Sequence, residues 1–134
     1  MIEYLEKNKV RAVYLPLIIY WLVLLTATSL PGKDLPNLGV SDKLEHFTAY
    51  FILAVILNLA LIVQNKYSLL KLKSSIFTII IIGSYAALDE LHQLFIPGRS
   101  CDIKDWAADF IAACIGVSVI FLIRVKSRNR NMKT

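Results

Sequence analysis

Several side chains that can transfer protons or bind ions lie inside otherwise strongly apolar stretches of this sequence. Asp89 and Gln93 are four residues apart, and Glu90 and His92 flank the same face of a helix. Carboxylates and imidazoles can act as acids, bases or metal ligands. A charged residue in a membrane-length helix costs about 2.5 to 3.5 kcal/mol on insertion scales. The default interpretation of these residues is therefore a functional one.

Two further segments carry polar residues at intervals of four. The first series is Asp42, His46 and Tyr50, and the second is Asp105 and Asp109. In a helix each series lies on one face, because residues four apart are neighbours along the axis.

Small residues continue these faces and predict close helix packing. The pairs are Ala112 with Gly116 and Gly83 with Ala87, and small residues at this spacing let membrane helices approach. The acidic side chains then face the interior of the bundle. We expect the three polar faces to converge at one depth and to form a cup open to one surface.

The composition predicts a membrane protein. The 134 residues are 57% hydrophobic and 19% charged, with a mean hydropathy of +0.60. Four segments have the length and apolar character of membrane helices, at residues 12–30, 47–63, 76–95 and 106–123. They predict an all-α fold, a four-transmembrane-helix bundle that forms a single domain over residues 1–134. Pro and Gly residues break the chain between the first two helices and between the last two.

The basic residues predict the orientation in the membrane. Most of the 15 Lys and Arg residues belong to the two tails and the middle loop, whereas the acidic residues gather in the other two loops and beside them. Basic loops stay in the cytoplasm. Both termini are therefore expected to be cytoplasmic, with the polar cup on the outer side of a bacterial plasma membrane. The net charge of +5 reflects this orientation and does not indicate nucleic-acid binding.

Neither a processed leader nor a cysteine site is expected. The first apolar segment is long for a signal peptide, and the position of Pro31 is unfavourable for a cleavage site. Cys101 and Cys114 fall in a loop and a helix, so they are not expected to form a disulfide, and they lack a metal-binding spacing.

The basic and acidic groups of the predicted cup favour different ligands. Arg99 offers a planar fork for phosphate or carboxylate, Lys43 is a mobile cation, and His46 donates or accepts near neutral pH. The acids could hold these groups in place, bind a hydrated divalent cation or meet a cationic substrate. No cofactor is evident, and a divalent metal remains open. The candidate ligand-binding residues are Asp42, Lys43, His46, Tyr50, Asp89, Glu90, Gln93, Arg99, Asp105 and Asp109.

In these motifs the chain resembles the VanZ-like family of small bacterial membrane proteins, named for a teicoplanin-resistance determinant. The matching motifs are Asp42-Lys43-x-x-His46-x-x-x-Tyr50, Asp89-Glu90-x-x-Gln93-x-x-x-Pro97-Gly98-Arg99, Asp105-x-x-x-Asp109 and Thr28-Ser29-Leu30-Pro31. Many relatives carry Asn in place of Asp109 and Gly in place of Ala112. The resemblance implies a link to reduced susceptibility to teicoplanin-like glycopeptides, without implying a reaction.

Three functional hypotheses follow. In the first, the cup recognises an envelope lipid headgroup or the membrane-anchored part of a lipoglycopeptide, as pockets with apolar walls and few polar groups do. In the second, the protein is an enzyme that hydrolyses or transfers a phosphoryl or acyl group on a lipid. Glu90 or Asp89 would be its base and His46 or His92 its acid, with or without a metal. The sequence shows no nucleophile motif for such an enzyme.

The third hypothesis is a purely structural polar cluster. Asp102 and Asp105 would cap the fourth helix, and His92 would form a structural hydrogen bond. Arg99 would pair with Asp89 or Glu90, and Lys43 with Asp105 or Asp109. A transporter is disfavoured because no inverted repeat is present. The small-residue faces would permit a homo-oligomer.

Overall fold

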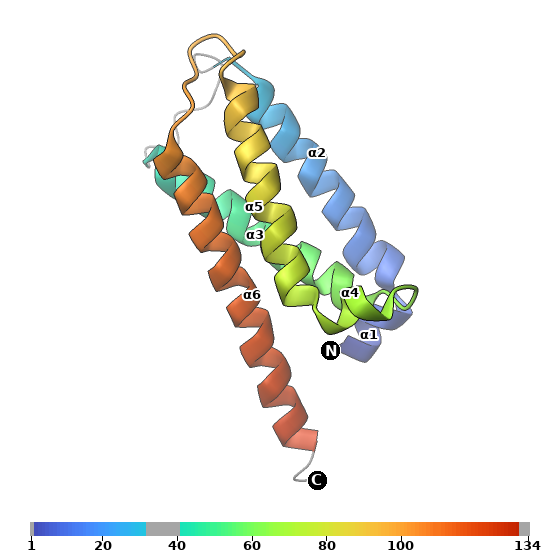
Figure 1. Cartoon of the computed structure of the whole chain (residues 1–134). Coiled ribbons are helices and arrows are strands. Elements are labelled where there is room, and N and C mark those ends of the chain that lie inside the picture. Colours follow the sequence, from blue (N-terminus) through green and yellow to red (C-terminus); the bar gives the residue numbers. More distant parts are fainter. Residues whose placement is uncertain (1, 32–40, 132–134) are drawn as a thin grey trace.

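The computed structural model describes the backbone of residues 2–31 and 41–131, and all of its regular elements there are helices. The chain folds as an antiparallel arrangement of long helices with shorter helices at one end (Figure 1). The elements are α1 (Ile2–Lys7), the π-helix η1 (Val10–Tyr14), α2 (Leu15–Ser29), α3 (Asp42–Val63), α4 (Ser68–Leu72), α5 (Ser74–Gln93) and α6 (Ile103–Asn131).

Four of these helical stretches are long and apolar enough to cross a membrane, as the sequence predicted. They are Val10–Ser29, Lys43–Val63, Ser74–Gln93 and Ile103–Asn129. The helices α3 and α6 extend beyond the predicted boundaries, since α3 begins at Asp42 and α6 ends at Asn131. Hydropathy marks where the apolar stretch begins, whereas the helical hydrogen bonds continue through the polar residues that flank it.

The first membrane helix contains a widened turn that hydropathy did not predict. Residues Val10–Tyr14 are π-helical and lead directly into α2, where Pro16 occupies the first turn. Proline has no backbone N–H, and its ring crowds the carbonyl four residues earlier. The wider turn before Pro16 accommodates this ring without ending the helix.

The segment that joins α3 to α5 is ordered by side-chain hydrogen bonds. The Gln64 Oε1 accepts the backbone N–H groups of Lys66 at 3.0 Å and Tyr67 at 2.8 Å, and the short helix α4 follows. The Nζ of Lys71 on α4 lies 2.7 Å from the Glu6 Oε1 on α1. These contacts fix a cap of short helices over one end of the bundle.

The helix α3 lies at the centre of the bundle, in contact with α2, α5 and α6. Its buried Leu53, Ala54 and Leu57 pack against Ile82 and Ala86 of α5 and against Ala112 and Ala113 of α6. The predicted small-residue face of α6 is confirmed at Gly116, where an added Cβ would lie 3.1 Å from the Phe51 carbonyl oxygen of α3. The close approach of α3 and α6 at this point thus depends on a residue without a side chain.

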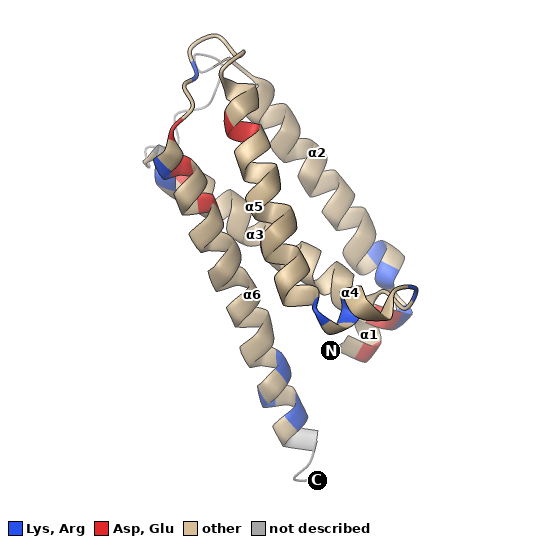
Figure 2. Cartoon of the chain, in the orientation of Figure 1, with Lys and Arg blue, Asp and Glu red and all other residues tan. Residues whose placement is uncertain are grey.

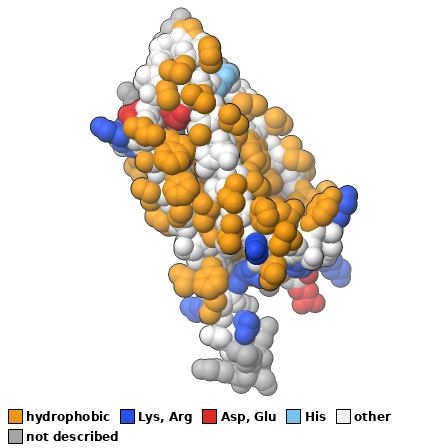
Figure 3. All heavy atoms as spheres, viewed as in Figure 1, with side chains coloured by type: hydrophobic (Ala, Val, Ile, Leu, Met, Phe, Trp, Pro, Cys, Tyr) orange, Lys and Arg blue, Asp and Glu red, His pale blue; other side chains and the backbone are white. Residues whose placement is uncertain are grey.

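Charged and apolar residues are segregated along the molecule. Hydrophobic side chains cover the middle of the face shown in Figure 3. In Figure 2, most acidic residues lie at the end where the α5–α6 loop turns, and Lys and Arg dominate the opposite end. The helix α1 and the end of α6 both lie at this basic end, so the first and the last helix that the structure describes reach the same side of the bundle.

The orientation predicted from charge can be tested at Cys101, which is a free and exposed cysteine in the α5–α6 loop. If the acidic end faces outward, a membrane-impermeant maleimide labels Cys101 in intact cells. An Asn8→Cys variant in a Cys101→Ser chain would be labelled only after permeabilisation. Labelling with the reverse pattern would place both termini outside.

The close approach of α3 and α6 predicts an unequal response of two glycines to alanine. Helix propensity favours alanine equally at both sites. An added Cβ at Gly116 meets a backbone oxygen, whereas at Gly83 it meets the ring of Phe110, which can rotate away. We expect Gly116→Ala to be less stable than Gly83→Ala by about 1–2 kcal/mol in thermal unfolding of the detergent-solubilised protein. Equal stabilities would contradict this packing.

Candidate functional site

The polar faces of α3, α5 and α6 meet at the acidic end of the bundle. The His46 Nδ1 on α3 lies 3.3 Å from Asp109 Oδ1 and 3.4 Å from Asp109 Oδ2 on α6. The Tyr50 hydroxyl, one turn further along α3, donates a 2.9 Å hydrogen bond to Asp89 Oδ2 on α5. All four residues are buried. The four-residue spacing therefore places these groups in contact across three helices.

Glu90 and Gln93 complete the buried group on α5, and both are 3% exposed. The Glu90 Oε2 accepts the backbone N–H of Asp102 at 2.8 Å, which fixes this carboxylate near the start of α6. The second oxygen, Oε1, is buried and accepts no hydrogen bond, and the Gln93 Nε2 is likewise unsatisfied. An unsatisfied buried polar atom is costly, so the arrangement leaves capacity for a further partner.

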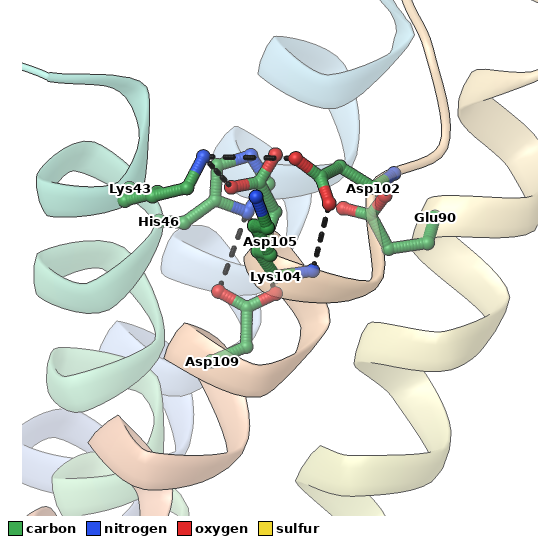
Figure 4. A network of polar contacts seen from close by, with 7 residues as sticks. All are labelled: Lys43, His46, Glu90, Asp102, Lys104, Asp105 and Asp109. Atoms are coloured by element: carbon green, nitrogen blue, oxygen red, sulfur yellow. Dashed lines mark hydrogen bonds and ion pairs between the residues drawn. The ribbon is translucent and has the colours of Figure 1, made fainter.

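Lys43 connects α3 to the start of α6. Its Nζ lies 3.2 Å from Asp105 Oδ1 and 3.6 Å from Asp102 Oδ2 (Figure 4). The expected pairing of Lys43 with Asp105 is confirmed. Asp102 also caps α6, because its Oδ1 accepts the backbone N–H of Lys104 at 2.8 Å. This N–H and the charge of Lys43 lower the pKa of Asp102.

Arg99 does not form the expected pair with Asp89 or Glu90. Its Nη2 donates to the Ala27 carbonyl at 3.2 Å and its Nε to the Leu30 carbonyl at 3.4 Å. Ala27 lies in the last turn of α2 and Leu30 is its C-cap, where carbonyls outside the regular helical pattern can accept further hydrogen bonds. The loop explains the difference, because Gly98 has a φ of 77° and turns the chain before Arg99. Arg99 therefore binds the end of α2 and forms no ion pair with the buried acids that the structure describes.

The remaining candidates are also placed by the structure. His92 is exposed, and its Nε2 lies 3.1 Å from the Ser29 hydroxyl, so it forms the structural hydrogen bond of the third hypothesis. Its role as the acid of an enzyme finds no support in this position. Asp42 is the first residue of α3, and its side chain lies outside the described residues.

A pocket of about 140 Å³ lies between α2, α3 and the α5–α6 loop. Its lining residues are Leu24, Ala27, Thr28, Glu45, His46, Ala49, Tyr50 and Arg99. Sequence periodicity did not single out Glu45 or the α2 residues of this wall. Thr28 belongs to a motif that carries the family resemblance, and this was the one indication that the end of α2 matters.

Three of the buried groups could hold a metal ion. His46, Glu90 and Asp109 each offer one ligand atom, and these atoms all lie within 4.8 Å of one another. Each residue comes from a different helix, so the three helices together shape the position (Figure 4).

Comparison with protein families agrees with the motifs in this site. A family model described as VanZ/LLP1 matches residues 11–124. The chain belongs to the VanZ/LLP1 family. With its four membrane-length helices, it is a multi-pass VanZ-like membrane protein. The matched range contains every described residue of the pocket and of the buried polar group. No curated protein and no solved structure matches the chain.

The hydrogen bond between Tyr50 and Asp89 predicts a stability difference between two tyrosine variants of this VanZ-like protein. Tyr50→Phe leaves a buried carboxylate without its donor and should cost about 1–3 kcal/mol. Among the described residues the Tyr85 hydroxyl donates no hydrogen bond to a carboxylate, so Tyr85→Phe is the matched control and should change little. Thermal unfolding in detergent measures both. Equal losses would show that the bond to Asp89 is not what stabilises this position.

Proposed function

We propose that this VanZ-like protein acts in the bacterial cell envelope by recognising an anionic group, phosphate or carboxylate, that is carried on an acyl chain. Either an envelope lipid headgroup or the membrane anchor of a lipoglycopeptide has this chemistry. The pocket beside Arg99 is the proposed binding site, at the outer face of the plasma membrane. The family resemblance implies a link to reduced teicoplanin susceptibility, and such binding would account for it.

The observation that carries the proposal is the position of Arg99 at an open pocket. Its hydrogen bonds to α2 use two of the five N–H groups of a guanidinium. The remaining donors suit a phosphate or carboxylate oxygen, and such charge-assisted bonds are stronger than neutral ones. The bonds to the α2 carbonyls hold the side chain in place, so little of its conformational freedom is lost on binding.

The pocket walls suit a ligand that is polar at one end and apolar at the other. Leu24, Ala27 and Ala49 provide an apolar surface, whereas Thr28 and His46 add polar groups beside Arg99. Beyond the pocket, α2 exposes large apolar side chains along its length, namely Ile18, Ile19, Leu22, Val23 and Leu25. An acyl chain can therefore follow α2 into the bilayer while its anionic end reaches Arg99.

The neighbouring acids do not exclude an anion from this pocket. Asp89 accepts the Tyr50 hydroxyl, Asp109 lies against His46, and Asp105 lies against Lys43. Each of these carboxylates thus has a contact from α3, and none of the three lines the pocket. Of the acids, Glu45 alone is among the residues that line the pocket.

Antibiotic susceptibility tests this proposal in a sensitive host. We expect the native chain to raise tolerance to teicoplanin more than to vancomycin, and Arg99→Ala to abolish the effect at equal abundance. Lys104→Ala is the matched control, because Lys104 is an exposed cation in the first turn of α6, at the same end of the bundle. Ala49→Leu fills the pocket without removing Arg99 and should act like Arg99→Ala. Loss of tolerance in the control variant, or none in both pocket variants, would reject the pocket as the site.

Binding to the purified protein in nanodiscs distinguishes the two ligand sources. Phosphatidylglycerol, teicoplanin and vancomycin are titrated separately, and Arg99→Ala should weaken the productive interaction about 10-fold or more. Binding of phosphatidylglycerol alone would identify a lipid headgroup, and binding of teicoplanin alone would identify the lipoglycopeptide. Unchanged binding of both by Arg99→Ala would exclude Arg99 as the recognition group.

A further inference from the structure

We infer that His46, Glu90 and Asp109 form a binding site for a divalent transition-metal ion of the Zn²⁺ or Mn²⁺ type. The three residues lie on α3, α5 and α6, and among them only His46 also lines the Arg99 pocket. It does not depend on the ligand proposed for that pocket. Its test measures metal binding, so either proposal can fail without the other.

The first argument is the convergence of three ligand atoms from three helices. Their separations stay within 4.8 Å, and a metal with bonds of about 2.1 Å holds its ligand atoms within about 4.2 Å of one another. If each side chain shifts by a few tenths of an ångström, the ligand atoms come close enough to bind one metal ion. The residues are far apart in sequence, so the fold itself brings this set together.

The second argument is that the set contains carboxylate oxygens without donors. The Glu90 Oε1 and Asp109 Oδ1 are buried and accept no hydrogen bond, although Asp109 Oδ1 lies near the His46 ring. Glu90 and Asp109 are 3% and 0% exposed. Water therefore reaches these oxygens poorly, and a buried carboxylate needs a cation or a donor to offset its desolvation.

The balance of charge points to a cation as the absent partner. Four buried carboxylates gather here, and among the described residues the one lysine in ion-pair contact with them is Lys43, which binds Asp105 and Asp102. Arg99 is bound to carbonyls of α2. No described Lys or Arg forms an ion pair with Glu90. A divalent ion would neutralise Glu90 and Asp109 together.

The ligand types select the class of metal. Mg²⁺ and Ca²⁺ favour oxygen ligands throughout, whereas an imidazole beside carboxylates suits Zn²⁺ and Mn²⁺. Three protein ligands leave one or more positions open for water or for a ligand oxygen. The backbone N–H of Asp102 holds the other oxygen of Glu90 at 2.8 Å, as outer hydrogen bonds orient the ligands of metal sites.

The test is Zn²⁺ titration of the full chain in phosphatidylcholine nanodiscs after chelation, with empty nanodiscs as blank and Mg²⁺ as the competing ion. Cys101→Ser and Cys114→Ser remove the two thiols as alternative ligands. We expect one Zn²⁺ per chain and little displacement by excess Mg²⁺. Glu90→Gln and Asp109→Asn should each weaken binding about 10-fold or more.

The matched control is Asp105→Asn, which removes the same charge one turn away on α6 from a carboxylate that is paired with Lys43. It should change Zn²⁺ affinity less than about 3-fold, well below the effect expected for a lost ligand. Absence of stoichiometric Zn²⁺, or equal weakening by all three variants, would overturn the site. If the ligand variants misfold, X-ray absorption of the Zn²⁺-loaded unsubstituted chain decides. One imidazole with oxygen ligands supports the site, and sulfur ligands or oxygen ligands alone overturn it.

Discussion

A buried carboxylate needs a hydrogen-bond donor or a positive charge beside it, and this requirement determines which side chains are in contact at the acidic end of this protein. Asp89 is met by the Tyr50 hydroxyl, Asp109 by the His46 ring and Asp105 by Lys43, and all three partners come from α3. In an apolar bundle each of these contacts outweighs a large desolvation cost only when its geometry is maintained. The position of α3 between α5 and α6 is therefore fixed by polar contacts at this end as well as by apolar packing.

Small residues make those polar contacts reachable. The absence of a side chain at Gly116 lets α6 approach the Phe51 carbonyl of α3, and Ala112 is fully buried on the same face. Because side chains one turn apart share this face, close packing further along α6 brings Asp109 within range of His46. The apolar packing and the polar contacts thus involve the same face of α6. A substitution that moves this face away from α3 would therefore also weaken the contact between Asp109 and His46.

The sequence was sufficient to predict four membrane helices and which polar residues share a face, because helical periodicity determines direction around an axis. Periodicity did not predict which side chains of different segments contact one another. The expected pair of Arg99 with an acid was wrong, since the positive φ of Gly98 turns the chain there and Arg99 donates to carbonyls at the end of α2. The pocket wall on α2 and the π-helical turn before Pro16 also depend on packing that periodicity does not encode.

The helix α2 is the least buried of the four membrane-length helices, yet it forms a wall of the pocket. Its exposed side chains are mostly apolar, so this wall of the pocket continues into a surface that suits the acyl chains of a bilayer. For an acyl-anchored molecule, occupancy then follows its mole fraction in the leaflet and its lateral diffusion. Other lipids of the leaflet would compete directly with such a molecule, so a change in lipid composition would alter its occupancy even when its concentration in the surrounding medium is constant.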